Sequence, residues 1–167
     1  MPFDGHNDML NNSPQSTPRR RYSIPRYRVT LVREGRALPA SGTVQTSVGA
    51  AALLRPLFTG LDREHFVVCG LDAKHAVIGV NVVSTGSLTL AIVHPREVFK
   101  PMILMNAGAC LCAHNHPSGD TTPSPEDLVL TKRLREVADL LGIPLLDHLI
   151  LGDDRYYSFA DQGWPGS

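Results

Sequence analysis

The chain has 167 residues, of which 43% are hydrophobic and 19% charged, and its formal net charge is zero. These values favour one globular domain over a disordered chain, and they give no overall field that would attract nucleic acid or an anionic membrane. No apolar run is long enough to span a membrane, and no secretory signal is visible. The three cysteines, Cys69, Cys110 and Cys112, are too few for a disulfide framework; they are expected to be buried, reduced thiols of a cytoplasmic protein.

Residues 1–25 are polar and rich in Asn and Ser, which predicts a disordered tail ahead of a single domain over residues 26–167. Five arginines lie at the end of this tail and just after it, interleaved with two tyrosines: Arg19, Arg20, Arg21, Arg26 and Arg28. Arginine beside aromatic residues can bind phosphates and stack on bases, so contact with DNA is one interpretation of this cluster. A solvated basic tail is the other.

Hydrophobic periodicity predicts alternating strands and helices along the rest of the chain. In chain order these are a half-exposed strand over 27–31, a helix over 46–57, strands over 65–71, 76–84 and 87–92, a helix over 96–108, a strand over 109–113, a helix over 125–141, and strands over 145–151 and 156–159. This order predicts an α/β domain in which helices pack against a curved, mixed β-sheet.

Chemistry is concentrated in the run His114-Asn115-His116-Pro117, which is followed by Ser124 and Asp127. Both His lie at the end of a predicted buried strand, where side chains two positions apart share a face. Two His and one Asp make a three-ligand set for a catalytic zinc, whose fourth position is left to water. Because the pKa of that water falls to about 7, the run predicts a metal-dependent hydrolase with one zinc per chain.

Simpler explanations exist for parts of this run. Ser124 and the residues after it also make a good helix start, with a capping Ser, a Pro at the first position and two acids. Cys110 and Cys112 share the strand face of the two His, so a cysteine could replace Asp127 as a ligand and form a structural zinc site. A zinc deaminase is set aside, because the chain has neither His-x-Glu nor Pro-Cys-x-x-Cys.

The string HNHPSGDTTPSPED, with HPREVF upstream and LLDHLILG downstream, resembles the JAB/MPN domain of the RadC family. Its His-x-His-Pro, Ser and Asp also resemble the JAMM motif of MPN-type metalloproteases. The likeness extends over about residues 46–164 and implies a single MPN/JAB-type domain, with a layering like that of cytidine deaminases. It implies that His114, His116 and Asp127 bind zinc, that an upstream Glu is the general base, and that Ser124 stabilises the oxyanion.

Five glutamates are candidates for the general base: Glu34, Glu64, Glu97, Glu126 and Glu136. Glu97 is explained as an acid in the first turn of a helix. Glu64 opens the strand over 65–71, where the catalytic Glu of the family enters, so Glu64 is the predicted base; its alternative is a solvated strand end. His148 belongs to an Asp-His pair that the family shares, and it either orients a metal ligand or is an ordinary buried histidine.

Three functions follow from these patterns. The first is a zinc hydrolase that cleaves a peptide or isopeptide bond of an unknown protein substrate. The second is a zinc-dependent nuclease or phosphoesterase acting on DNA, with Arg96 or the N-terminal arginines binding phosphate. The third is a non-catalytic interaction domain.

RadC proteins carry the traditional name DNA repair protein. Longer members of the family have an additional N-terminal part that resembles a helix-hairpin-helix module. About forty-five residues precede the matched region here, as in short, stand-alone members.

Overall fold

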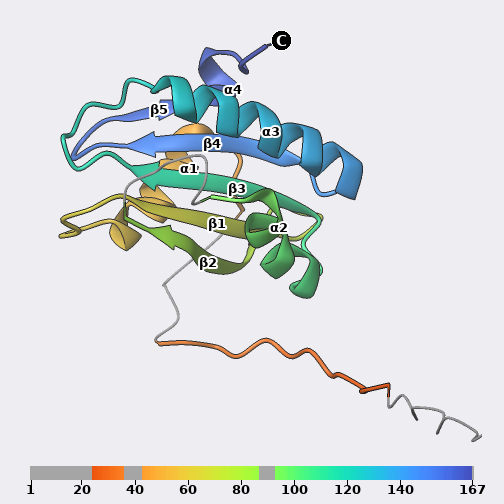
Figure 1. Ribbon diagram of the computed structural model, residues 1–167. Coiled ribbons are helices and arrows are strands. Elements are labelled where there is room, and N and C mark those ends of the chain that lie inside the picture. Colours follow the sequence, from red (N-terminus) through yellow and green to blue (C-terminus); the bar gives the residue numbers. More distant parts are fainter. Residues whose placement is uncertain (1–23, 36–42, 87–92, 167) are drawn as a thin grey trace, which may run out of the picture.

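The computed structural model describes residues 24–35, 43–86 and 93–166. Five strands of this part form one sheet in the order β2-β1-β3-β4-β5 (Figure 1). Their bounds are β1 His65–Leu71, β2 Val77–Thr85, β3 Ala109–Asn115, β4 Leu145–Leu151 and β5 Tyr156–Ser158. β3 and β4 are parallel and the other neighbours are antiparallel, so the sheet is mixed, as predicted.

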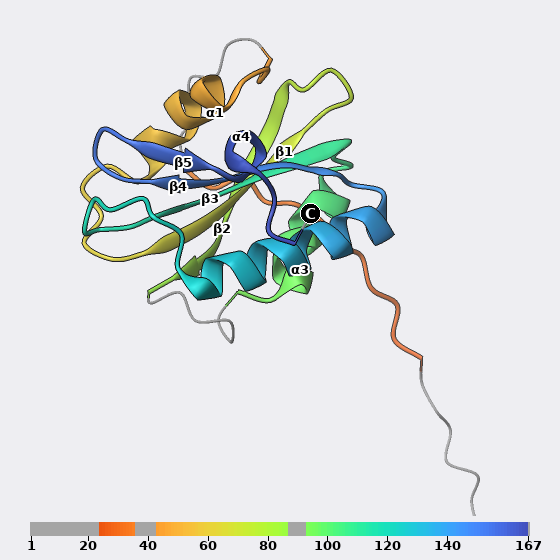
Figure 2. The same ribbon diagram turned by 90° about the horizontal axis from the view of Figure 1, so that it is seen from above.

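Helices cover both faces of the sheet (Figure 2). They are α1 Ser47–Leu54, continued by a 3₁₀ turn over Arg55–Leu57, then α2 Pro95–Leu104, α3 Pro125–Leu141 and the short α4 Phe159–Gln162. α1 packs on one face, and α2 and α3 pack on the other. The prediction of an α/β domain with helices against a mixed sheet is confirmed.

Two hydrophobic cores lie on the two faces, and β1 and β3 supply alternate residues to each. Phe66 and Cys112 point toward α2 and α3, whereas Val67 and Ala113 point toward α1. Every residue of β3 is therefore buried. A central strand with a parallel neighbour is expected to be apolar on both faces, because helices cover both. His114 is an exception within this strand, since it is a fully buried polar residue at its C-terminal end.

The observed elements correct the predicted ones at several points. Residues 27–31 form no strand in the described part of the chain, and Tyr27, Val29 and Leu31 are exposed. Alternating apolar residues form a strand only where a partner strand pairs with them, and no strand of the described residues pairs with this segment. Phe159 begins α4 instead of ending a strand, because the Ser158 hydroxyl accepts a hydrogen bond from Asp161 N.

Helix ends also differ from prediction, for local reasons. The α-helical part of the first helix ends at Leu54, because Pro56 has no N–H to continue the ladder. The second helix ends at Leu104, and Asn106 then takes a left-handed conformation with a φ of 54°. The predicted strand over 87–92 and the tail over 1–23 lie outside the described residues. The boundary between tail and domain near residue 25 stays a prediction.

Candidate metal centre

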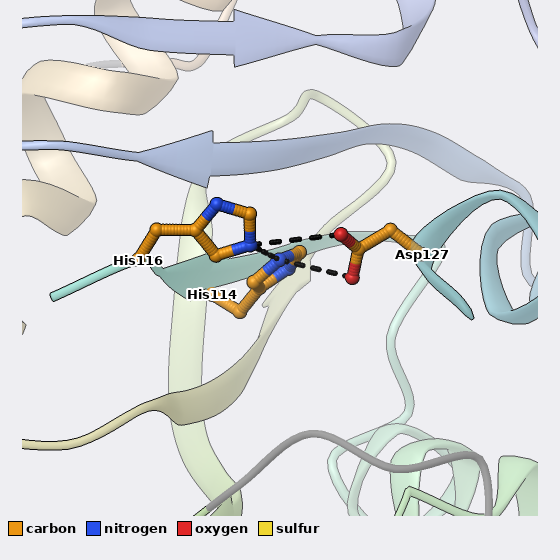
Figure 3. Close-up of side chains that lie close together, drawn as sticks. All are labelled: His114, His116 and Asp127. Carbon is orange, nitrogen blue, oxygen red and sulfur yellow. Dashed lines mark hydrogen bonds and ion pairs between the residues drawn. The ribbon is translucent and has the colours of Figure 1, made fainter. Parts of the chain in front are cut away.

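The site forms where the end of β3 meets the beginning of α3. His114 is on β3, His116 follows the strand, and Asp127 is in the first turn of α3. Figure 3 shows both imidazoles directed toward the carboxylate. Nε2 of His114 is 3.1 Å from Nε2 of His116 and 3.2 Å from Oδ1 of Asp127, and Nε2 of His116 is 3.5 Å from Oδ2 of Asp127. The structure thus brings all three predicted ligands together.

These distances fit a tetrahedral metal. Zinc binds His nitrogen and carboxylate oxygen at about 2.0–2.1 Å, which separates neighbouring ligand atoms by roughly 3.3 Å. Nδ1 of His116 lies 2.6 Å from the backbone carbonyl of Asp120, which can only accept, so Nδ1 carries a proton and the neutral ring keeps its lone pair on Nε2. The donor set therefore suits a divalent cation that prefers nitrogen and oxygen ligands. Among the described residues, these three form the one group of His, Cys, Asp or Glu with such convergence.

Burial and charge set the protonation of the three ligands. Burial works to raise the pKa of Asp127, but the adjacent rings of His114 and His116 outweigh it and hold that pKa far below its usual value. Burial lowers the pKa of His114, whose side chain has no exposed surface. The pKa of the more exposed His116 is raised, mainly by its hydrogen bond to Asp127. Asp127 is therefore an anion and His114 favours the neutral ring, as metal binding requires.

The first turn of α3 is both a helix start and the support of a ligand. Ser124 Oγ accepts from Asp127 N at 3.1 Å, and Asp127 Oδ2 accepts from Ser124 N at 2.8 Å, which completes a capping box. The Ser124 hydroxyl also lies 2.7 Å from Asp127 Oδ2 and donates to it. The sequence left two explanations for Ser124 and Asp127, a helix start and part of a metal site. The two are compatible, because the cap fixes the carboxylate that faces the histidines.

A cavity of about 340 Å³ opens beside the ligands. It is lined by Glu64, His116, Pro117, Ser118, Ser124, Glu126 and Asp127. Glu64 immediately precedes β1, and Phe66 of β1 pairs with His114 of β3, so Glu64 comes opposite His116. The predicted base and the predicted oxyanion residue therefore line the same cavity as two of the ligands. Their catalytic roles stay predictions.

Asn115 is a site residue that sequence reasoning missed. Its Oδ1 accepts from His65 N at 2.8 Å, and its Nδ2 donates to the Arg63 carbonyl at 3.1 Å. These two bonds tie the residues on either side of Glu64 to the end of β3. A polar side chain between the two candidate ligand histidines was the available signal, but its partners depend on the pairing of β1 with β3.

We expect Asn115→Ala to lower catalytic turnover while zinc content stays at the wild-type level, because Glu64 loses its support and the ligands do not. The two lost hydrogen bonds should also lower stability by about 2 kcal/mol. Thermal unfolding, metal analysis and turnover measure the three quantities. Asn81→Ala, on the edge strand β2, is the matched control and should leave turnover unchanged. Equal turnover in Asn115→Ala and wild type would show that the bonds do not position Glu64.

The cysteines are not ligands in this arrangement. Cys110 and Cys112 are buried in the core under α2 and α3, outside the metal-binding group. Burial raises the pKa of the Cys69 and Cys110 thiols to about 12, and it raises the pKa of Cys112 well above its usual value. Zinc binds the thiolate, so this protonation disfavours the cysteine-ligand alternative.

Consistent with these pKa values, all three thiols should resist alkylation in the native protein at pH 8. Iodoacetamide treatment followed by intact mass measurement should show no adduct before unfolding and three adducts in guanidinium chloride. Fast native labelling of any one cysteine would show that its thiol is exposed or ionised, contrary to its buried position.

Of the arginines that were predicted to bind phosphate or DNA, those among the described residues lie apart from the candidate metal site. Arg96 is near the start of α2, pairs with Glu97, and lines a different cavity of about 610 Å³ between α2 and α3. Arg26 and Arg28 are exposed in the segment 24–35, which extends away from the domain in Figure 1. Arg19, Arg20 and Arg21 lie outside the described residues. Contact with DNA through these arginines stays a prediction.

A family model described as RadC-like JAB domain matches residues 44–164. The chain belongs to the RadC-like JAB domain family. Similar curated proteins include a UPF0758 protein of Desulfitobacterium hafniense, 52% identical over 103 residues, which are 62% of this chain and 45% of that protein. Another is a UPF0758 protein of Shouchella clausii, 48% identical over 115 residues, or 69% of this chain and 50% of that protein. The chain spans about half the length of the curated relatives it matches.

The resemblance to the RadC family inferred from the motifs is confirmed by this match. The matched residues of this RadC-like JAB domain include β1 to β5 and all three candidate metal ligands. The names of the relatives state no activity. In the part of the chain that the structure describes, no helix is both long and apolar enough to cross a bilayer.

Proposed function

We propose that this RadC-like JAB domain is a zinc-dependent hydrolase that cleaves a peptide or isopeptide bond. The observation that carries the proposal is the convergence of His114, His116 and Asp127 beside the cavity that Glu64 also lines. His114 and His116 offer imidazole nitrogens and Asp127 offers a carboxylate oxygen, a set typical of catalytic rather than structural zinc sites. Three protein ligands leave a position for a reactant.

His114, His116 and Asp127 would hold the ion. When bound, zinc supplies Lewis acidity and lowers the pKa of a coordinated water to about 7. The remaining chemistry belongs to the side chains of the cavity. Glu64 would accept a proton from the attacking water and deliver it to the leaving nitrogen, as a general base and then a general acid.

Ser124, which lines the same cavity, would stabilise the oxyanion. Its hydroxyl donates to Asp127 Oδ2 in this structure, so it holds the carboxylate in place before substrate binds. Rotation of the hydroxyl would let it donate instead to the oxygen on which charge develops. A donor placed there typically contributes a factor of about 10²–10³ to turnover.

The lining of the cavity favours a neutral amide over a phosphodiester. Among the described residues that line it there is no Lys or Arg, and Glu64 and Glu126 are acidic. A phosphate usually requires cationic side chains, and Arg96 lies in the other cavity. This lining favours the amide hydrolase over the nuclease, and the complete set of three convergent ligands favours it over the non-catalytic domain. An association with DNA repair stays a prediction, as does the cytoplasmic location, which buried thiols support.

A substrate screen tests the proposal. The purified protein, loaded with one equivalent of zinc, is incubated with a peptide library, with isopeptide-linked lysine conjugates and with single- and double-stranded DNA. We expect cleavage of an amide class, loss of cleavage after chelation, and recovery when zinc is restored. Zinc-dependent cleavage of DNA alone would overturn the amide assignment in favour of the nuclease. Zinc binding without any cleavage would favour the non-catalytic domain.

A further inference from the structure

Behind His114 lies a chain of buried polar groups that leads away from the cavity. Nδ1 of His114 is 2.9 Å from Nε2 of His148 on β4. Nδ1 of His148 is 2.6 Å from Oγ1 of Thr131 on α3, and this oxygen is 2.6 Å from the backbone carbonyl of Asp127. His114, His148 and Thr131 have no exposed surface. The chain therefore links one proposed ligand to the backbone of another without contact with solvent.

The donor and the acceptor of each hydrogen bond in this series follow from counting protons. The carbonyl of Asp127 can only accept, and two oxygens 2.6 Å apart require a hydrogen between them, so Thr131 donates its single hydroxyl proton there. Toward His148 the same oxygen must then accept, which places the His148 proton on Nδ1. A neutral imidazole has one N–H, so Nε2 of His148 is an acceptor, and His114 donates to it from Nδ1.

The neutral form of His148 is consistent with its surroundings. Its ring stacks on Phe159 with a centroid distance of 5.3 Å, and the ring of Phe66 lies 5.3 Å away on a tilt. An apolar enclosure of this kind disfavours a charged ring. Asp147 is the other residue of the Asp-His pair, and its carboxylate has different partners. It accepts hydrogen bonds from the Ser158 hydroxyl at 2.6 Å and from Ala160 N at 3.0 Å.

We propose that Thr131 and His148 are positioning residues that keep the ring proton of His114 on Nδ1 and so leave its Nε2 free for the metal. The inference rests on the metal site of the proposed function. His116 reaches the same state by a direct bond to the Asp120 carbonyl. The tautomer of His114 would be set through His148 by Thr131 of α3, and α3 also carries Asp127. One helix would therefore set the position of one ligand and the tautomer of another.

The opposite order of protons makes a distinct prediction. If Thr131 donated to Nδ1 of His148, then His148 would donate from Nε2, and the proton of His114 would lie on its Nε2. That proton would point at His116 and Asp127 and would block the lone pair that a metal needs. Thr131→Val should allow this order, because the hydroxyl that accepts from His148 is gone. Thr131→Ser keeps the hydroxyl and is the matched control.

Ring tautomers can be read in the metal-free protein by long-range ¹H–¹⁵N correlation spectra of the histidine rings. We expect Nδ1–H for both His114 and His148 in the wild type and in Thr131→Ser, and a shift of His114 to Nε2–H in Thr131→Val. Zinc titration against a competing chelator should show affinity lowered by about 10–100-fold in Thr131→Val and restored in Thr131→Ser. Circular dichroism compares the folds of the three proteins.

Two results would overturn the inference: Nε2–H on His114 in the metal-free wild type, or wild-type tautomers together with wild-type zinc affinity in Thr131→Val. If Thr131→Val does not fold, the wild-type spectrum alone decides the tautomer. The proposed function fails separately, if wild-type protein does not bind zinc at all. The tautomer measurement needs neither zinc nor substrate, so the two failures are distinguishable.

Discussion

Glu64→Gln is expected to lower turnover of the cleaved amide by a factor of about 10²–10⁴, the usual contribution of a general base. Glutamine has nearly the shape of glutamate but does not take up a proton at neutral pH. The substitution therefore removes proton transfer and leaves the cavity, the ligands and the backbone of β1 in place. Zinc content and thermal stability should match the wild type, and kcat should fall more than KM changes.

Glu136→Gln is the control for this experiment. Glu136 lies well along α3, away from the residues that line the metal cavity, so the same chemical change there should leave kcat unchanged. The comparison also separates the classes of function. A binding domain would lose no property on substitution of Glu64, and wild-type turnover in Glu64→Gln would mean that another group moves the proton.

His116→Ala is expected to reduce bound zinc from about one ion per chain to nearly none. Two protein ligands remain, and sites of this type use three. Zinc should also raise the melting temperature of the wild type, since an ion at a hundred times its Kd stabilises the fold by about 2.7 kcal/mol. For a chain of this size that corresponds to roughly 5–10 °C. The melting temperature of His116→Ala should not respond to zinc.

Elemental mass spectrometry and thermal unfolding with and without zinc make these two measurements. His116 suits the test because its side chain is 15% exposed, so truncation leaves less empty volume than it would at His114. His75→Asn is the control, because His75 is exposed, its left-handed φ of 62° suits Asn, and it lies outside the ligand group. Full zinc binding by His116→Ala would contradict the proposal that His114, His116 and Asp127 are the zinc ligands.

Local rules account for the parts of the site that the sequence could predict. His114 and His116 are two residues apart at a strand end, and Asp127 sits three residues after a capping Ser, so strand periodicity and helix capping fix each of them within a few residues. Thr131, His148 and Asn115 are different. Their contacts depend on which strands pair and in which register, and β3 pairs with β4 across more than thirty residues of sequence.

The same distinction explains the errors in the fold. The alternation over residues 27–31 satisfies the rule for a half-buried strand, but a strand also needs a neighbour, which single-sequence periodicity does not provide. Phe159 looked like a strand residue because it is apolar and follows two tyrosines. In the structure its ring packs against His148 while its backbone opens α4, so tertiary packing and a Ser cap decided its conformation.

Double burial of β3 has a consequence for how an ion could enter or leave. β3 is paired along both edges and covered on both faces, so its amides should exchange with deuterium only when the whole domain unfolds. Residues 117–123 lack helix and strand and are only partly covered. Exchange of the ion on the timescale of native fluctuations would therefore proceed by opening of this loop and the first turn of α3, which would move Asp127 while His114 stays in place.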